Sequence, residues 1–343
     1  MTDQRGTIRI EALGHAAEPS EMAENVRTGL TSAPKDLSPW PKYFYDAEGS
    51  RLFEEITDLP EYYQTRTELS ILRRMAEEIV SRTRCTELVE LGSGSASKTR
   101  TLLDAMCGPR SPGAVRPRYV PLDVSESTLR ESAGKLAEEY PGLKIHGYVG
   151  DFDRSVKRLL DARARETDAS GSGGRLVAFL GGTVGNFTPA RRRTFLAAVC
   201  AGLRPGDHLL IGVDLVKDAE TLEAAYNDAT GVTARFNKNL LNVLNEQLEA
   251  QFNPDLFVHR AFYDARKSRI EMWLYSSVEQ TVTLAGPGLD AHFGAGEGMR
   301  TEISAKFTRP AAESMLEDAG FIPVGWYMDE EELFGLILGI VRS

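Results

Sequence analysis

The sequence predicts an α/β fold in which helices cover both faces of a largely parallel, doubly wound sheet, with a smaller additional domain. Three observations predict it. Short apolar runs alternate with helical periodicities from about residue 85 to residue 213. A glycine turn joins the first apolar run to the first helical pattern. After residue 213 this alternation stops, and a mostly helical stretch is followed by strand-like runs.

The strands of the expected sheet are short and apolar, and stretches with the 3.6-residue spacing of amphipathic helices separate them. A strand, a crossover helix and a second strand in this order favour parallel pairing. The expected strands are residues 87–91, 118–122, 144–149, 176–180 and 208–213. The expected helices are residues 97–106, 126–140, 155–167 and 189–203.

The segments before and after this alternation differ from it in composition. Residues 1–20 are polar and mixed, which is typical of a flexible arm, and an amphipathic helix is expected over residues 21–37. Residues 217–305 carry helical patterns and then strand-like runs such as I-E-M-W-L-Y, which indicates an insertion with its own antiparallel strands.

The C-terminal part returns to the main sheet. A helix is expected over residues 310–319, followed by strands over residues 322–327 and 334–341. The sequence therefore predicts two domains that are each discontinuous. The smaller domain is expected to contain residues 1–65 and 217–305, and the larger one residues 66–216 and 306–343.

The composition excludes several classes of function. Of the 343 residues, 42% are hydrophobic and 26% charged, as in globular proteins, and a net charge of −10 disfavours non-specific nucleic-acid binding. No apolar stretch approaches the roughly 18 residues that a membrane span needs. Three cysteines without close spacing indicate reduced thiols and a cytoplasmic location. Five scattered histidines give no metal-ligand spacing, so no metal is expected, and we expect a monomer that acts on a small molecule.

The glycine turn lies in the segment L-V-E-L-G-S-G-S-A-S, which contains Glu90, Gly92 and Gly94. A turn of this kind lets a nucleotide-like ligand lie against bare backbone. Dinucleotide-binding folds usually have a third glycine where this sequence has Ser97, and Glu90 occupies a position where class I methyltransferases place an acid. A plain tight turn is the alternative interpretation.

Acidic residues also end the next two strands. Asp123 follows Y-V-P-L, and Asp151 precedes Phe152 in G-D-F. Because the carboxyl ends of parallel strands meet at one edge of a sheet, these acids and Glu90 should face one crevice. A carboxylate can accept from both hydroxyls of a ribose. Asp123 could instead cap the following helix, and Lys98, which could meet a ligand carboxylate, could be an ordinary solvated lysine.

The fourth strand ends in F-L-G-G-T-V-G-N-F-T-P. Gly181 and Gly182 would let a substrate approach the backbone closely. The Asn186 amide offers both a donor and an acceptor, which suits a zwitterionic amino acid. The alternative is that Asn186 is a turn residue before the helix that Pro189 begins.

At these motifs the sequence resembles the bacterial histidine N-alpha-methyltransferases of ergothioneine biosynthesis. The resemblance extends from about residue 21 to the C-terminus. It implies a class I, Rossmann-like fold with a substrate-binding domain, S-adenosylmethionine as methyl donor, and trimethylation of the L-histidine α-amine to hercynine. Besides the segments above, it is carried by K-Y-F-Y-D-A-E-G-S-R-L-F, L-P-E-Y-Y-Q-T-R-T-E, D-L-V-K-D, A-Y-N-D-A-T-G-V-T-A-R-F-N, I-E-M-W-L and T-E-I-S-A-K-F.

The resemblance also implies roles for individual residues. Tyr45 would lie near the reacting amine. The S-adenosylmethionine site would contain Glu90, Gly92, Gly94, Lys98, Asp123, Asp151 and Phe152. The histidine site would contain Tyr62, Gly181, Asn186, Tyr226, Met272, Glu302, Ile303 and Ser304.

The segment T-E-I-S would bind the imidazole ring of histidine. Glu302 and Ser304 are spaced i, i+2, so on a strand they face the same side while Ile303 points away. A carboxylate and a hydroxyl can satisfy both ring nitrogens. Without the resemblance, two exposed polar strand residues would explain the pattern. The sequence departs from the family at Ala305, where a cysteine is usual and which should point away from the pocket, and at Gly182, where a serine is expected.

Three other functions fit parts of the sequence less well. A methyltransferase for another aromatic amino acid or amine would leave the Glu302 carboxylate facing an apolar ring edge. A non-catalytic S-adenosylmethionine-binding protein would have no need for the polar residues of the histidine site. A nicotinamide-dependent dehydrogenase is disfavoured by Ser97 in place of the third glycine.

Overall fold

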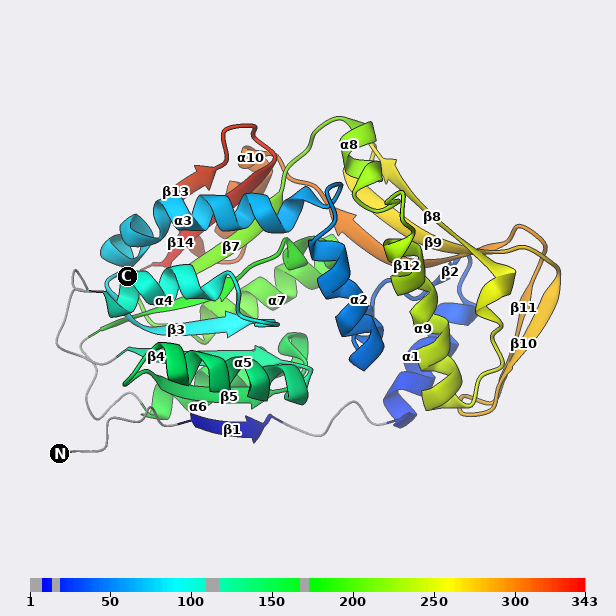
Figure 1. Cartoon of the computed structure of the whole chain (residues 1–343), viewed down its shortest axis with the longest axis horizontal. Coiled ribbons are helices and arrows are strands. Elements are labelled where there is room, and N and C mark those ends of the chain that lie inside the picture. The colour runs from blue at the N-terminus through cyan, green and yellow to red at the C-terminus, as the bar shows by residue number, and fades with distance from the viewer. Residues whose placement is uncertain (1–7, 14–18, 109–116, 167–172, 343) are drawn as a thin grey trace.

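A computed structural model describes residues 8–13, 19–108, 117–166 and 173–342 of the chain. It contains a large unit, built on an eight-stranded sheet, and a smaller unit beside it (Figure 1). The buried hydrophobic side chains separate in the same way. Two clusters lie on the two faces of the large sheet, and a third fills the smaller unit.

The large sheet has the strand order β1-β5-β4-β3-β6-β7-β14-β13. All neighbouring strands pair in parallel except β14, which is antiparallel to both of its neighbours. The predicted central strands and closing hairpin are confirmed. The bounds are β1 Ile8–Ala12, β3 Cys85–Leu91, β4 Arg118–Asp123, β5 Lys144–Val149, β6 Gly174–Phe179, β7 His208–Asp214, β13 Phe321–Met328 and β14 Phe334–Val341.

Helices cover both faces of this sheet, as predicted. Side chains that alternate along β3 enter different cores: Leu88 packs in the cluster with α3, α4 and α5, and Val89 in the cluster with α6, α7 and α10. Helices α3, α4 and α5 lie in front of the sheet in Figure 1. The bounds are α3 Tyr63–Thr83, α4 Thr99–Cys107, α5 Glu126–Glu139, α6 Phe152–Glu166, α7 Pro189–Ala201 and α10 Arg309–Asp318.

Two expectations for the N-terminal region are wrong. Residues 8–12 are not part of a flexible arm, because β1 adds to the sheet edge in parallel with β5. The first helix, α1 (Pro19–Thr31), ends before residue 37, and Lys35–Asp36 form strand β2. Pro34 explains the early end, since proline lacks the amide proton that continues a helix and disfavours helical geometry in the residue before it.

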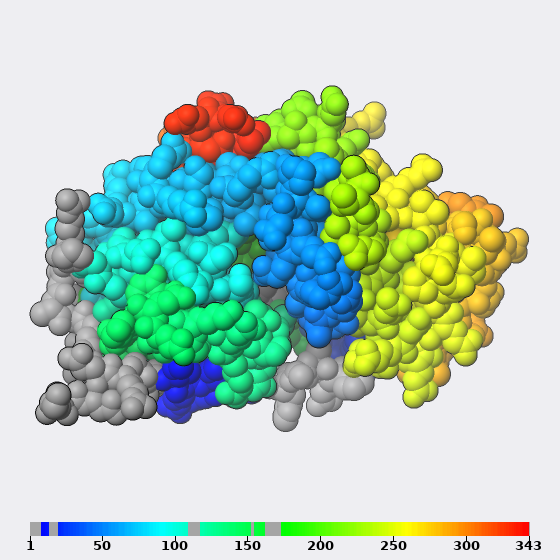
Figure 2. All heavy atoms as spheres, viewed as in Figure 1, coloured from blue at the N-terminus to red at the C-terminus, as the bar shows by residue number. Residues whose placement is uncertain are grey.

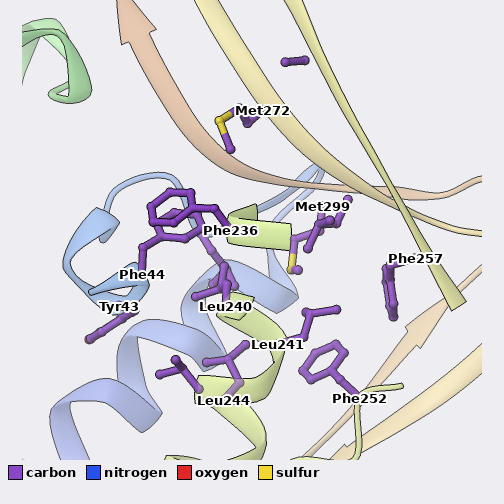
Figure 3. Close-up of a cluster of buried hydrophobic side chains, with 14 of the residues drawn as sticks. Tyr43, Phe44, Phe236, Leu240, Leu241, Leu244, Phe252, Phe257, Met272 and Met299 are labelled. Atoms are coloured by element: carbon purple, nitrogen blue, oxygen red, sulfur yellow. The ribbon is translucent and has the colours of Figure 1, made fainter. Parts of the chain in front are cut away.

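The smaller unit combines an N-terminal segment with the predicted insertion. Strand β12 lies between β2 and β9, with β8 outermost, and β10 and β11 form a separate hairpin. Its core packs α9 against the sheet, with the Phe44 ring stacked on Phe236 at 4.9 Å (Figure 3). The bounds are η1 Pro41–Phe44, α2 Ala47–Thr57, α8 Ala219–Ala224, α9 Val232–Leu248, η4 Pro254–Leu256, β8 Phe257–Asp264, β9 Arg269–Ser276, β10 Gln280–Leu284, β11 Leu289–Phe293 and β12 Gly298–Ala305.

The two units meet where β12 approaches the large sheet. Phe307, just beyond β12, bridges in parallel to Leu215 at the end of β7. Gly185, in the short helix η3 (Thr183–Asn186), lies so close to β12 that an added Cβ would be 2.8 Å from the carbonyl oxygen of Ala305. Ala305 packs partly against the core of the large unit, away from the cavity described below, as expected.

No helix among the described residues is long and apolar enough to cross a membrane.

Candidate active site

A cleft of about 520 Å³ opens at the carboxyl ends of β3, β4, β5 and β6. Helix α2 of the smaller unit borders it on the opposite side, and Figure 2 shows the surface hollowed between α2 and the helices of the large sheet. A smaller cavity of about 60 Å³ continues from the cleft between the two units. Tyr45, Phe53, Tyr62, Gly181 and Asn186 line both.

The glycine turn forms one wall of the cleft. Gly92 and Gly94 have φ values of 77° and 48°, and an added Cβ at Gly94 would meet no atom within 4 Å, so bare backbone faces the cleft. The Asp123 carboxylate accepts hydrogen bonds from the Gly94 and Ser125 amides at 2.8 and 2.9 Å. The cap of α5 is Ser125, so Asp123 does not serve as the helix cap. Burial raises the pKa of Asp123.

Glu90 lines the cleft, as predicted, and also supports the glycine turn. Its side chain is buried and accepts hydrogen bonds from the Thr99 hydroxyl at 2.6 and 2.7 Å and from the Tyr119 hydroxyl. Burial raises the pKa of Glu90 to about 7. These bonds tie the end of β3 to the start of α4, so they fix the direction in which the chain leaves the glycine turn.

Lys98 lies on the cleft wall and pairs with an acid that the sequence analysis missed. Its Nζ is 2.5 Å from Glu68, whose side chain is fully buried. The Glu68 carboxylate also accepts from the Gly181 amide at 2.9 Å. Glu68 could have been noticed as an acid on the buried face of α3, at helical spacing from the buried Gln64 and Leu72.

Asp151, at the end of β5, also borders the cleft. It accepts from Lys42 at 2.9 Å, and Lys42 bonds to Glu21 of α1 at 3.1 Å. The charge of Lys42 thus ties the N-terminal segment to this end of the cleft. Phe152 begins α6, but its side chain lies outside the described part of the structure.

The smaller cavity brings together most residues predicted to contact histidine. It is lined by Tyr45, Tyr62, Gly181, Asn186, Tyr226, Met272, Glu302 and Ser304, which come from both units. Ile303 is an exception. It is buried but does not line the cavity, because alternate residues of β12 face opposite sides of the strand.

Glu302 faces this cavity without a hydrogen-bonding partner among the described residues. Burial raises the pKa of Glu302 to about 7, and the charge of Lys306 opposes that rise. An unpaired carboxyl group in a buried cavity is costly unless a ligand donates to it. The geometry therefore suits a ligand that presents an N–H or O–H donor to Glu302.

Three tyrosines surround the cavity. Burial raises the pKa values of Tyr45, Tyr62 and Tyr226 well above the usual value of about 10, and the nearby Glu302 adds to the rise. All three are therefore neutral hydroxyls at physiological pH. Phe53, which the sequence analysis did not single out, packs edge-on against Tyr45 and Tyr62 with ring centroids 5.6 and 6.3 Å away.

A buried ionic cluster lies at the wall of the cavity, which its central residue Asp214 lines, and was not predicted either. Asp214, at the end of β7, accepts from Lys306 at 2.6 Å, from Lys217 at 2.7 Å and from the Tyr63 hydroxyl at 2.8 Å. Burial opposes ionisation of Asp214, but the two lysines outweigh it and hold the pKa of this carboxyl below its usual value. No sequence pattern connects these residues, because 151 positions separate Tyr63 from Asp214 and a further 92 separate Asp214 from Lys306.

Gly182 has a left-handed backbone with φ of 70°. An added Cβ would find its nearest neighbour, in the Phe334 ring, at 3.6 Å, so there is room for a serine side chain but not without backbone strain. Glycine at this position therefore relieves strain at the cavity wall.

The fold and the cleft define a class of protein. Three features together form the architecture of class I methyltransferases that depend on S-adenosylmethionine. They are a parallel sheet with one antiparallel strand beside its edge, a glycine turn after β3, and acids at the ends of β4 and β5. The sequence profile of the family described as "Histidine-specific methyltransferase, SAM-dependent" matches residues 22–340. The chain belongs to this family, and the predicted fold class and methyl donor are confirmed.

Named relatives agree with this assignment. The chain is 46% identical over 319 residues to the histidine N-alpha-methyltransferase of Mycolicibacterium smegmatis, covering 93% of this chain and 94% of the relative. It is 44% identical to that of Mycobacterium tuberculosis, covering 96% and 99%. Ergothioneine biosynthesis protein 1 of Schizosaccharomyces pombe is 32% identical over 65% of this chain and 30% of its own length.

The ionic cluster predicts a specific effect on stability. We expect Asp214→Asn to lower the free energy of unfolding by about 3 kcal/mol at pH 7, because two buried lysines lose their counter-ion. The lowered pKa of Asp214 means that its contribution is present above its unfolded pKa, near 4, and is lost as the pH falls through its folded value. Urea unfolding of both proteins is measured at pH 7 and at progressively lower pH. The difference in free energy of unfolding between wild type and Asp214→Asn should shrink as the pH falls.

The matched control is Asp255→Asn, since Asp255 is exposed and its side chain has no partner among the described residues. This control should change the free energy of unfolding by less than about 0.5 kcal/mol. Equal effects of the two substitutions would contradict a stabilising role for the cluster.

Proposed function

We propose that the protein transfers methyl groups from S-adenosylmethionine to the α-amine of L-histidine, three times in succession, and so makes hercynine for ergothioneine biosynthesis. The observation that carries the proposal is the placement of Glu302 and Ser304 on one face of β12, toward a cavity that opens into the glycine-lined cleft. The family and the named relatives support the same substrate.

The cleft suits the methyl donor in size and chemistry. Its volume of about 520 Å³ is within the range of small-molecule sites, and its wall exposes backbone at Gly94. We infer that Asp123 binds the ribose hydroxyls, Asp151 the adenine amino group and Lys98 the carboxylate. The bound molecule supplies a methyl group activated by a sulfonium.

We infer that the smaller unit binds the amino acid. Tyr62 and Asn186 line the part of the cavity that would hold the α-carboxylate, and their hydroxyl and amide groups can donate to it. The Tyr226 hydroxyl donates its proton to Ser304 at 2.9 Å, so Tyr226 would border the amino acid with its ring instead of donating to the carboxylate. Glu302 and Ser304 would then meet the two imidazole nitrogens. Met272, which is buried, supplies an apolar wall beside the ring.

The α-amine must react as the free base, yet it is mostly protonated near neutral pH. The raised pKa of Tyr45 makes this residue a poor general base. We infer that the Tyr45 hydroxyl orients the amine while the proton leaves to water. Alignment of amine, methyl carbon and sulfur supplies most of the acceleration, roughly 7–11 kcal/mol in well-oriented systems.

Repeated methylation needs space around the nitrogen. Gly181 and Gly182 form the wall of the cavity near the cleft, and both have positive φ values. The absence of side chains there leaves space for added methyl groups. A phenyl substrate is disfavoured because its apolar ring would leave the Glu302 carboxyl without a donor, and an indole substrate is disfavoured because its ring has no lone pair for Ser304.

The direct test is mass spectrometry of L-histidine incubated with the protein and excess S-adenosylmethionine. We expect a product heavier by three methyl groups. L-tryptophan and L-phenylalanine, run in parallel, should give at least about a hundredfold less product, because neither can satisfy both Glu302 and Ser304. Preferred methylation of either aromatic amino acid would contradict the assignment of the cavity.

Glu302 also predicts a pH dependence. Ionisation near pH 7 turns its carboxyl into a charge-assisted acceptor, which is about twice as strong as a neutral one. We therefore expect the ratio of kcat/KM for wild type to that for Glu302→Gln to rise roughly tenfold between pH 6 and pH 8. Titration of the substrate affects both proteins and cancels in the ratio.

The control for this experiment is Glu279→Gln, since Glu279 is exposed and is not one of the residues that line the cavity. The ratio of kcat/KM for wild type to that for Glu279→Gln should stay constant with pH. A constant ratio for Glu302→Gln as well would show that the ionised carboxylate does not contact the substrate.

A further inference from the structure

We propose that Lys306 determines substrate specificity by fixing the direction of the hydrogen bonds in the cavity, so that the cavity accepts a neutral imidazole with one N–H and one lone pair. This inference rests on the proposed function and extends it to a residue that does not line the cavity itself. Lys306 would act as a positioning residue through Ser304 and Tyr226.

The ammonium group of Lys306 uses all of its donors inside the protein. Its side chain has no exposed surface, and its Nζ lies 2.6 Å from Asp214, 3.0 Å from the Tyr226 hydroxyl and 3.0 Å from the Ser304 hydroxyl. An ammonium has three N–H groups and no lone pair, so it can only donate. Both hydroxyls must therefore accept from it.

The direction of the remaining bonds follows from this constraint. Tyr226 accepts from Lys306 and from the Gln64 amide, which together occupy both lone pairs of its hydroxyl oxygen. Its own proton is left to donate, and it donates to Ser304 at 2.9 Å. Ser304 then accepts from both Lys306 and Tyr226, and a hydroxyl oxygen has only two lone pairs. The Ser304 proton is the one donor of this network without an acceptor among the described residues.

The free donor of Ser304 and the free acceptor of Glu302 lie on the same face of β12. Together they match a ring that offers a lone pair to Ser304 and an N–H to Glu302, which is a neutral imidazole. A doubly protonated imidazolium would place an N–H against the Ser304 proton. A pyrrole or indole ring offers no lone pair, so the Ser304 donor would stay unsatisfied.

The charge on Lys306 is supported by its surroundings. Asp214 is buried and in contact with it, and the nearby Lys217 and Tyr63 complete the hydrogen bonds of that carboxylate. The ammonium also lies 4.8 Å from the centroid of the Tyr226 ring, a favourable position for a cation. Because Lys306 and Gln64 occupy both lone pairs of the Tyr226 hydroxyl, removal of Lys306 would free one of them, and Ser304 could then turn its proton to Tyr226.

The test compares L-histidine with 3-(pyrrol-2-yl)-L-alanine and 3-(pyrrol-3-yl)-L-alanine, which carry the N–H at either ring position but no lone pair. Methyl transfer is measured as kcat/KM. For wild type we expect histidine to exceed the better pyrrole isomer by at least about tenfold, because that isomer leaves the Ser304 donor unsatisfied. In Ser304→Ala this preference should fall to within about twofold.

Lys306→Met distinguishes a positioning role from a purely structural one. We expect the preference for histidine over pyrrole to fall several-fold, because Ser304 can then donate to Tyr226. A structural role would lower both activities together and leave the preference unchanged, which would overturn the proposal. If Lys306→Met does not fold, Lys306→Gln, whose amide has only two N–H donors, is measured instead, with thermal unfolding as the check of folding.

The outcomes separate this inference from the proposed function. Failure of wild type to methylate L-histidine would overturn the proposed function. Methylation of L-histidine together with an equally good pyrrole substrate would leave the proposed function intact and overturn only the role of Lys306 and Ser304.

Discussion

The ion pair between Asp214 and Lys306 is the interaction on which the rest of the site depends. Asp214 ends β7 of the large sheet, and Lys306 follows β12 of the smaller unit, so the pair joins the two units at the base of the substrate cavity. Both side chains are almost fully buried, and loss of one partner of a buried pair costs about 3–5 kcal/mol. The hydrogen bonds from Lys306 to Tyr226 and Ser304 offset part of the cost of burying these charges, and they also orient both hydroxyls.

On the other side of the cavity, the sheet topology determines where the methyl donor would lie. The carboxyl ends of β3, β4 and β5 bring Glu90, Asp123 and Asp151 to one edge, with the glycine turn between helix and strand. Glu68 holds Lys98 and the Gly181 amide at the point where the cleft passes into the cavity. The reaction would therefore occur between a rigid sheet edge and a strand supplied by the insertion.

Much of this arrangement was predictable from sequence because it follows local rules. Parallel strands place Asp123 and Asp151 at one edge, and the period of two along a strand pairs Glu302 with Ser304 and turns Ile303 away. The ionic cluster was not predictable, because Asp214 and Lys306 meet only through the packing of two units. Strand β1 was missed because I-R-I-E-A is short and half polar, and its position at the sheet edge depends on pairing with β5.

If Lys306 sets the hydrogen-bond directions in the cavity, the bound imidazole should be held in one protonation state. Nitrogen-15 NMR of labelled L-histidine, bound to the protein with S-adenosylhomocysteine in place of the methyl donor, observes that state directly. The account predicts one protonated ring nitrogen and one unprotonated nitrogen that accepts a hydrogen bond, at a pH where free histidine is partly imidazolium. Two protonated ring nitrogens in the bound state would contradict it.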